Sequence, residues 1–271
     1  HVLLEKPMAL TKAECELMIQ SCRLADVALV VGHSHSFDAP YASARSLIQQ
    51  GTYGAIRMIN AMQCTDFLYR PRRPEELDTR LGGGVVFSQG AHQIDIIRLL
   101  SGKPAVEVHA ITGQWDAERP TEGAFCTNIR FEDGSFASAM YSGYGHFDSD
   151  ELMGWVGEMG QRKVGGTSAR SRMSCLSADK ETEEKNRTTF GGSGYQSVRG
   201  KLPSAPEFHQ HFGPVTIFCD NADIRVMPDR LLIYQRGRMS EKRVPAPAVP
   251  RQEVINEFYG VVVEQVEPVH D

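Results

Sequence analysis

The sequence lacks a hydrophobic run long enough to cross a membrane, and it lacks an excess of positive charge. No apolar stretch reaches the roughly 18–20 residues of a membrane-spanning helix. The 29 lysines and arginines are outnumbered by 34 aspartates and glutamates, which gives a net charge of −5. A nucleic-acid-binding surface would need the opposite balance. We therefore expect a cytoplasmic globular protein whose partners include neither a membrane nor a nucleic acid.

The cysteines lack the spacing of a zinc site or a redox centre. The sequence holds six of them, and no two form a Cys-x-x-Cys pair. Each stands in a stretch with helix-like or strand-like apolar patterning, so we predict buried, free thiols of a reducing compartment. The six are Cys15, Cys22, Cys64, Cys126, Cys175 and Cys219.

A glycine-rich fingerprint for dinucleotide binding is also missing. The stretch Gly191-Gly192-Ser193-Gly194 comes closest, but no strand pattern precedes it and no helix pattern follows it. The sequence starts inside an apolar run at His1, without an initiator methionine or a signal-peptide pattern. It stops just after a helix pattern, so we expect a piece of a longer chain.

The first 36 residues predict a strand, a helix and a second strand. Val2–Leu4 is a short apolar strand, and Thr11 with Glu14 forms a capping box that opens a helix. Val27–Gly32 is a continuous apolar run, typical of a strand that is buried on both faces. This order within some thirty residues predicts one βαβ unit of a parallel sheet.

The remaining residues predict a large, mostly antiparallel sheet with a few helices on one face, so the fold class is α+β. Helices are expected from Asp38 to Gln50 and from Pro250 onward. Gln161–Gly213 has little apolar periodicity, and long loops or hairpins are expected there. Strand patterns occupy Ala55–Asp66, Ala105–Trp115, Ala124–Glu132, Ser135–Tyr144, Pro214–Asp220, Ile224–Met227, Leu231–Tyr234 and Glu241–Val244.

The stretch Gly82–Gly102 is the first candidate for a functional site. Three glycines open it, which allows the backbone to approach another group closely. A helix is predicted after Gly90, with His92 and Asp95 on one side of its first turn. A histidine at a helix start can serve chemistry or can simply be packed, and the residues alone leave both readings open.

Two more candidates lie where the predicted parallel strands end. Lys6 follows the first strand, and His33 and His35 follow the second. Ligands of open α/β sheets bind beyond these carboxyl ends. The lysine could equally be solvated, and the two histidines could bind a metal only with further ligands, since no carboxylate or cysteine adjoins them. His209, His211 and Glu207 form a weaker cluster, which we expect to be part of a loop.

A polar loop with four arginines is the last candidate. It is locally basic in an acidic protein, and a planar guanidinium binds a carboxylate through two hydrogen bonds. The loop is therefore either a carboxylate clamp or a solvated surface. The arginines are Arg70, Arg72, Arg73 and Arg80.

Two motifs in this order resemble the glucose–fructose oxidoreductase/inositol dehydrogenase/MocA (Gfo/Idh/MocA) family. The first is Val2–Pro7 (VLLEKP), followed by the capped helix and VALVVGHSHSFD. The second is GGGVVFSQGAHQID, and the closing strands and helix resemble the family as well. The resemblance implies that residues 1–36 are the remnant of a dinucleotide-binding Rossmann domain. Residues 37–271 would then be a substrate-binding and oligomerisation domain.

The resemblance implies an NAD(P)-dependent dehydrogenase, with NAD or NADP as cofactor. Lys6 and His92 match its catalytic lysine and histidine, and the histidine is the general acid/base. Glu5, Lys6, Pro7 and His35 would face the cofactor, and Pro7 matches a proline that is often in a cis bond. The chain as given is expected to bind the cofactor poorly and to be inactive alone. The expected partners are a small-molecule substrate and further copies of the chain.

Ser88 departs from the family, which usually carries an aspartate four residues before the histidine. The loss of a negative charge suits an anionic substrate. Together with the arginine loop, it predicts a carboxylated cis-dihydrodiol such as phthalate 4,5-dihydrodiol, and the stretches FSQGAHQIDIIRLL and RPRRPEELD resemble members with that substrate. The residues expected to bind the substrate are Ser88, Asp95, Arg70, Arg72 and Arg73.

Two other functions remain open from the sequence. One is a non-catalytic dimerisation or ligand-sensing module of the same fold, which the Ser88 departure permits. The other is a metal-dependent lyase that would use His33, His35 and His92. In every case an open sheet with an exposed apolar face predicts pairing with a second copy, as a homodimer or a homotetramer.

Overall fold

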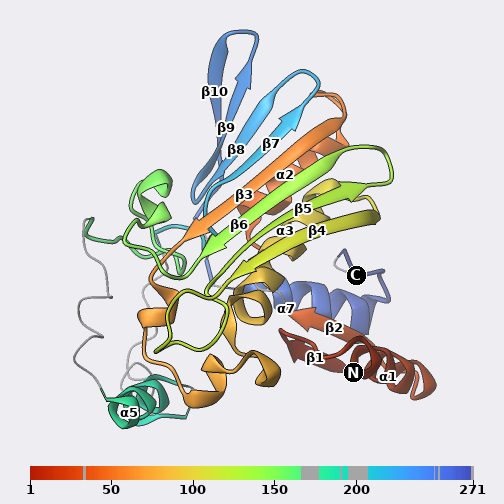
Figure 1. Ribbon diagram of the computed structural model, residues 1–271. Helices are drawn as coiled ribbons and strands as arrows, with labels where there is room; N and C mark the ends of the chain where they lie inside the picture. The colour runs from red at the N-terminus through yellow and green to blue at the C-terminus, as the bar shows by residue number, and fades with distance from the viewer. Residues whose placement is uncertain are drawn as a thin grey trace.

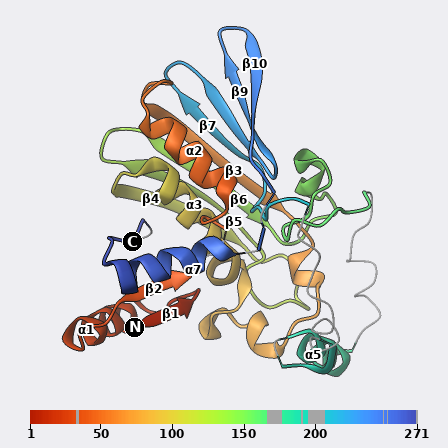
Figure 2. The ribbon, with the colours of Figure 1, turned by 180° about the vertical axis from the view of Figure 1, so that it is seen from behind.

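The computed structural model describes residues 1–32, 35–165, 177–189, 191–194, 207–246, 248–249 and 251–269. Figures 1 and 2 show it from opposite sides. His33, Cys175 and Pro250 lie outside the described residues, so the expectations for them have no structural counterpart. Within the described ranges, no helix is long and apolar enough to cross a membrane.

A small parallel unit forms the start of the chain. β1 (Val2–Glu5) pairs with β2 (Leu29–Gly32) in parallel, and α1 (Lys12–Leu24) connects them. Thr11 caps α1 through the capping box that the sequence predicts. The βαβ prediction is confirmed, but β2 is only partly buried, because this sheet has two strands in the described part of the chain.

The C-terminal helix returns to this unit. α7 (Gln252–Tyr259) lies beside β2 in both views (Figures 1 and 2). A Cβ atom placed on Gly32 would lie 3.6 Å from Cγ1 of Val254, so helix and strand are in close contact there. Val254 is buried, as the apolar stripe predicts.

An eight-stranded sheet makes up most of the remaining structure. Its order is β10-β9-β8-β7-β3-β6-β5-β4, and only the β3–β6 pair is parallel. The fold class predicted from the sequence is confirmed. The strands are β3 (Ile56–Cys64), β4 (Ala105–Gly113), β5 (Ala124–Phe131), β6 (Phe136–Ser142), β7 (Val215–Cys219), β8 (Asp223–Met227), β9 (Arg230–Gln235) and β10 (Arg238–Arg243).

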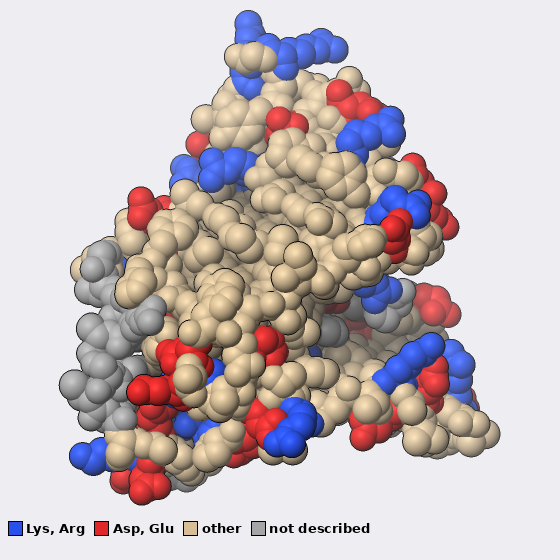
Figure 3. All heavy atoms as spheres, viewed as in Figure 1, with Lys and Arg blue, Asp and Glu red and all other residues tan. Residues whose placement is uncertain are grey.

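Two helices cover one face of this sheet. α2 (Ala39–Gln49) and α3 (Ala91–Ser101) lie on the face that Figure 2 shows. Alternate residues of the strands point toward them and are buried, including Ile59, Ile129 and Ile217. This alternation is what a sheet with one covered face requires. The other face is open, and Figure 3 shows it as a broad surface with few charges.

Three sequence predictions need correction. β10 begins at Arg238, three residues before the predicted strand at Glu241, because it pairs with β9 along its whole length. A helix, α5 (Ala178–Thr188), lies in the stretch predicted as loops or hairpins. Nearly all of its residues are polar, so the sequence shows no apolar helical period there. None of the five described cysteines is fully buried, and Cys126 is exposed because β5 places it on the open face.

Candidate active site

Lys6 reaches from the end of β1 to the helix that carries His92. Its Nζ donates a hydrogen bond to the main-chain oxygen of Ser88. Burial lowers the pKa of Lys6, and the nearby Glu158 carboxylate offsets part of that effect. The Lys6–Pro7 peptide bond is cis. Ser88 precedes His92 by four residues, so the amine of Lys6 contacts the chain about one helical turn before His92.

The glycines before this helix leave room for the buried carboxylate of Glu122 against its first turn. Gly84 has φ +82°, and a Cβ atom there would lie 2.2 Å from Oε1 of Glu122. The same Oε1 accepts a hydrogen bond of 3.1 Å from the amide of Val86. The Val86–Gly90 stretch forms a π-helical turn that continues directly into α3.

His92 is therefore not in the first helical turn, as the sequence predicts, but in the second. Gly90 has helical backbone angles, φ −58° and ψ −36°, so the helix does not start after it. The free amides of the helix start lie near Val86, where Glu122 occupies one of them. Aromatic groups, rather than a helix N-terminus, form the surroundings of His92.

Two rings enclose the side chain of His92, which is 6 % exposed. Its ring centroid lies 4.7 Å from that of His35, with the two rings nearly perpendicular. It lies 4.9 Å from the ring of Phe212, which also contacts His35 at 5.3 Å. These three residues come from the ends of β2, α3 and the segment before β7, so only the tertiary structure brings them together.

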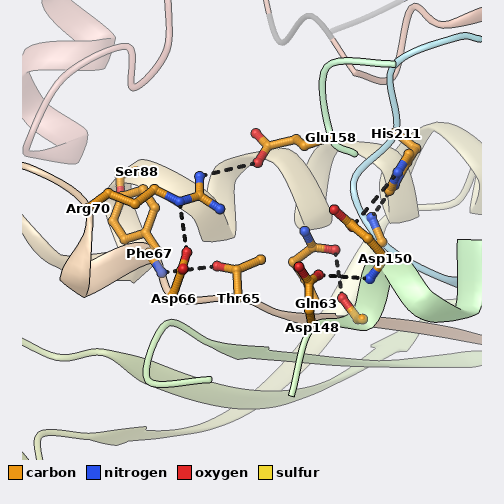
Figure 4. Close-up of polar contacts among 12 residues, drawn as sticks. Gln63, Thr65, Asp66, Phe67, Arg70, Ser88, Asp148, Asp150, Glu158 and His211 are labelled. Carbon is orange, nitrogen blue, oxygen red and sulfur yellow. Dashed lines mark hydrogen bonds and ion pairs between the residues drawn. The ribbon is translucent and has the colours of Figure 1, made fainter. Parts of the chain in front are cut away.

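Glu158 connects this ring cluster to the arginine loop. Its carboxylate lies 3.6 Å from Nε2 of His35 and 3.8 Å from Nη1 of Arg70. Figure 4 shows Glu158 facing Arg70, with His211 further along the same wall. Burial by itself would raise the pKa of Glu158, but His35 and Arg70 outweigh it and lower the pKa to about 2. Glu158 is thus an anion in the middle of the site.

Arg70 and Glu158 stand between two cavities. One, of about 590 Å³, is lined by Gln63, Tyr69, Lys163 and other polar groups. The second, of about 390 Å³, is lined by Gln89 and by residues of α5. A larger cavity of about 670 Å³ lies near Arg80 and Arg119, away from the histidines. Glu158, which faces His35, lines both cavities that Arg70 borders, so we take these two as the candidate substrate space.

The four arginines of the loop after β3 do not act as one group. Arg70 faces the site and pairs with Asp66 at 3.1 Å. Arg72 is buried, lies over the ring of Phe67 and donates to the carbonyl oxygen of that residue. Arg73 pairs with Glu75 and Glu76, and Arg80 pairs with Asp78 at the exposed surface. Among the four, Arg70 lines both cavities and lies beside Glu158, whereas Arg72 lines only the second of them.

Ser88 and Asp95, both predicted to bind the substrate, lie in different surroundings. The hydroxyl of Ser88 donates to the main-chain oxygen of Gly84, and its own carbonyl accepts from Lys6. Asp95 lines a separate cavity of about 390 Å³ together with Arg45 and Arg98. Among the predicted substrate-binding residues, the structure thus brings Arg70 to the site and places Asp95 elsewhere.

The residues predicted to face the cofactor also lie in two different environments. Glu5 and Pro7 are exposed at the end of β1, beside Lys6. His35 is 2 % exposed and lies inside the protein. Among the described residues, no group of three histidine, cysteine or carboxylate side chains is arranged to hold a metal ion.

Sequence reasoning missed three groups of this site. The sequence predicts no element around Glu158, predicts only a helix start at Asp38, and predicts a loop around His211. His211 does lie in a loop, but it is buried, and its Nε2 donates to the carbonyl oxygen of Val156 at 2.9 Å. In the sequence, the nearness of His211 to Glu207 and His209 was the one sign that it could belong to a site.

Comparisons with known proteins identify relatives of this chain. The model of the GFO/IDH/MocA C-terminal domain matches residues 41–161. The 1-carboxy-3-chloro-3,4-dihydroxycyclo hexa-1,5-diene dehydrogenase of Comamonas testosteroni is 44% identical over 273 residues, covering 100% of this chain and 68% of the relative. The myo-inositol 2-dehydrogenase of Thermotoga maritima is 30% identical over 111 residues, 41% of this chain and 31% of that protein.

A solved structure shares the whole fold. The putative dehydrogenase from Bordetella bronchiseptica RB50 aligns with a TM-score of 0.88 and 36% identity, over 100% of this chain and 70% of that one. The fold and these relatives define an oxidoreductase of the dehydrogenase class. The chain belongs to the Gfo/Idh/MocA family, whose dehydrogenases generally use NAD(P).

Proposed function

We propose that this protein oxidises one hydroxyl of a carboxylated cyclic cis-diol, with NAD or NADP as the hydride acceptor. The convergence of Lys6 and His92 on one stretch of helix carries this proposal. Arg70 beside two cavities supplies the cation for a carboxylate. The name of the Comamonas relative, a dehydrogenase of a carboxylated dihydroxycyclohexadiene, supports the same substrate class.

The residues of the chain would divide the chemistry between them. His92 accepts the proton of the hydroxyl as the C–H bond breaks, a role that suits an imidazole near neutral pH. Lys6 donates a hydrogen bond to the same oxygen and stabilises the negative charge that develops on it. Arg70 holds the carboxylate and so fixes which ring carbon faces Lys6.

The cofactor supplies a nicotinamide that accepts the hydride. In the described part of the chain, the residues that suit it lie at the carboxyl end of β1, where Glu5 and Pro7 flank Lys6, whose amine contacts the helical turn before α3. This position favours the nicotinamide end of the molecule. In this function, residues 1–36 would belong to a dinucleotide-binding domain and residues 37–271 would form the substrate domain.

Assays of the full-length protein test the proposal directly. Reduction of NAD⁺ and NADP⁺ is measured with phthalate 4,5-dihydrodiol, with a monocarboxylated cis-dihydrodiol and with an uncarboxylated one. His92→Gln should lower kcat by about 10²–10⁴-fold, and Lys6→Met should lower it as well. Lys12→Met, at an exposed lysine of α1, is the matched control for Lys6→Met. Full turnover in both site variants would refute the proposal and favour the non-catalytic module.

We also propose that the open sheet face pairs with a second copy. Ile111, Cys126, Met140 and Met62 lie opposite one another across β4, β5, β6 and β3, which places an apolar row on that face (Figure 3). Ile111 is 77 % exposed. Met140→Glu should lower the sedimentation mass from that of an oligomer toward that of one chain. A wild-type protein that sediments as a monomer would refute the pairing.

A further inference from the structure

The two histidines of the site are adjacent and buried. Their ring centroids are 4.7 Å apart, and His35 and His92 are 2 % and 6 % exposed. At this distance and burial, a charge on one ring strongly affects the other, because little water screens it. The protonation of His35 therefore matters for the chemistry of His92.

Carboxylates face both ring nitrogens of His35. Nδ1 lies 3.6 Å from Oδ2 of Asp38, the residue that starts α2. Nε2 lies 3.6 Å from Oε1 of Glu158, which follows β6 in the chain. A neutral imidazole has one N–H group, whereas the imidazolium has two. Two facing carboxylates thus favour the charged form.

The other charged groups around His35 and His92 do not reverse the preference of His35 for its charged form. Burial works against a charged His35, yet Asp38 and Glu158 outweigh it and raise the pKa of His35. Burial also raises the pKa of Asp38, which makes Glu158 the stronger counter-ion. On its other sides Glu158 meets the cations Lys6 and Arg70.

His211 adds no competing charge to the cluster. Its Nε2 donates to the carbonyl oxygen of Val156, and its Nδ1 accepts from the amide of Gly213 at 3.0 Å. This pattern fits the neutral ring, and burial lowers the pKa of His211. Phe212, which contacts both His35 and His92, carries no charge.

We propose that His35 is a positioning residue for His92: as an imidazolium held by Asp38 and Glu158, it disfavours a proton on the adjacent His92 ring and keeps that ring a base. The inference rests on the proposed function, in which His92 must accept a proton from the substrate. A protonated His92 has no lone pair for that proton. Replacing His35 should therefore let His92 hold a proton to higher pH.

Nuclear magnetic resonance of the full-length protein with ¹³C-labelled histidine tests this without any turnover. The signal of His92, assigned with His92→Gln, is followed as the pH rises. In His35→Gln the titration midpoint of His92 should move up by about one pH unit or more. His109→Gln, at an exposed histidine of β4, should leave it unchanged. An unchanged midpoint in His35→Gln refutes the proposal.

Glu158→Gln provides a second variant that leaves both rings in place. Removing this counter-ion should make His35 lose its proton at lower pH and should move the midpoint of His92 upward by less than His35→Gln does. The acid limb of kcat/KM should move in parallel with the midpoint in both variants. A large loss of turnover without any shift in midpoint or pH profile would refute the proposal.

The two proposals fail in different ways. A wild-type protein that oxidises no diol, but whose His92 midpoint shifts in His35→Gln, refutes the proposed function and leaves the histidine pair standing. A protein that oxidises the diol with unshifted midpoints refutes the pair alone.

Discussion

His35 and His92 share one buried cluster, whereas the arginines of the Arg70–Arg80 loop pair with several separate carboxylates. The histidines come from separate elements and meet across the interface between the βαβ unit and the large sheet. Most of the arginines find their partners within the same loop, a few residues away. The arginines, which are close together in sequence, therefore do not form one group in space. The two histidines, which are far apart in sequence, do.

The reason for the difference lies in what surrounds each group. A buried histidine cannot use water and must interact with whatever the fold places beside it. An arginine in an exposed loop can use a nearby aspartate or glutamate at little cost. Arg70 uses the nearby Asp66 in the same way, but it also lines both cavities and faces Glu158.

The largest effect on stability is expected at Arg72, where the loop is buried. Arg72→Ala removes the guanidinium that lies 3.6 Å above the Phe67 ring and leaves the Phe67 carbonyl and Glu76 without it. Loss of a partner from a buried pair costs about 3 kcal/mol. Urea denaturation of the full-length protein measures the free energy of unfolding.

Arg73→Ala is the matched control for that measurement. Arg73 is adjacent in sequence but pairs with Glu75 and Glu76 near the surface, so the change should cost less than about 0.5 kcal/mol. Equal losses in the two variants would show that the loop behaves as one group after all.

The next effect is expected on substrate affinity at Arg70. Arg70→Lys keeps the charge but loses the two-pronged hydrogen bonding to a carboxylate, so KM for the carboxylated diol should rise about tenfold. The KM for an uncarboxylated diol should change little. Arg80→Lys, far from the site and paired with Asp78, should change neither value. An equal rise for both substrates would assign Arg70 to the structure of the loop instead.

The smallest effect is expected in the pH dependence of stability. Glu158, with its pKa lowered to about 2 from 4.5, stabilises the fold above about pH 4.5 and loses this contribution as the pH falls. His35, with its pKa raised from 6.5, stabilises the fold below about pH 6.5 and loses this contribution as the pH rises through the raised value. The pair therefore contributes most between these limits.

Melting temperatures of wild type and Glu158→Gln from pH 3 to pH 9 measure this contribution. Their difference should be largest at pH 4.5–6.5 and should shrink on both sides. Glu207→Gln, at an exposed ion pair with Arg162, should give a small and nearly flat difference. A Glu158→Gln difference that keeps growing above pH 8 would contradict the pairing with a charged His35.

Local signals in the sequence predicted most of the architecture. The capping box at Thr11, the alternation in the strands and the left-handed glycine at Gly102 each act within a few residues. The strand-end position of Lys6 likewise follows from the order of β1 and Pro7. The sequence also pointed to His92, although the helical turn before it, started at Val86 and capped by Glu122, was not visible as a pattern.

The sequence by itself determined where strands and helices form and which residues end them, because hydrophobic period and capping depend on near neighbours. Only the tertiary structure decided that Glu158 flanks His35, that Phe212 covers both histidines and that Arg70, of the four loop arginines, lies beside Glu158. Such contacts join residues more than fifty positions apart. Their energy depends on burial and distance in space, which no local pattern encodes.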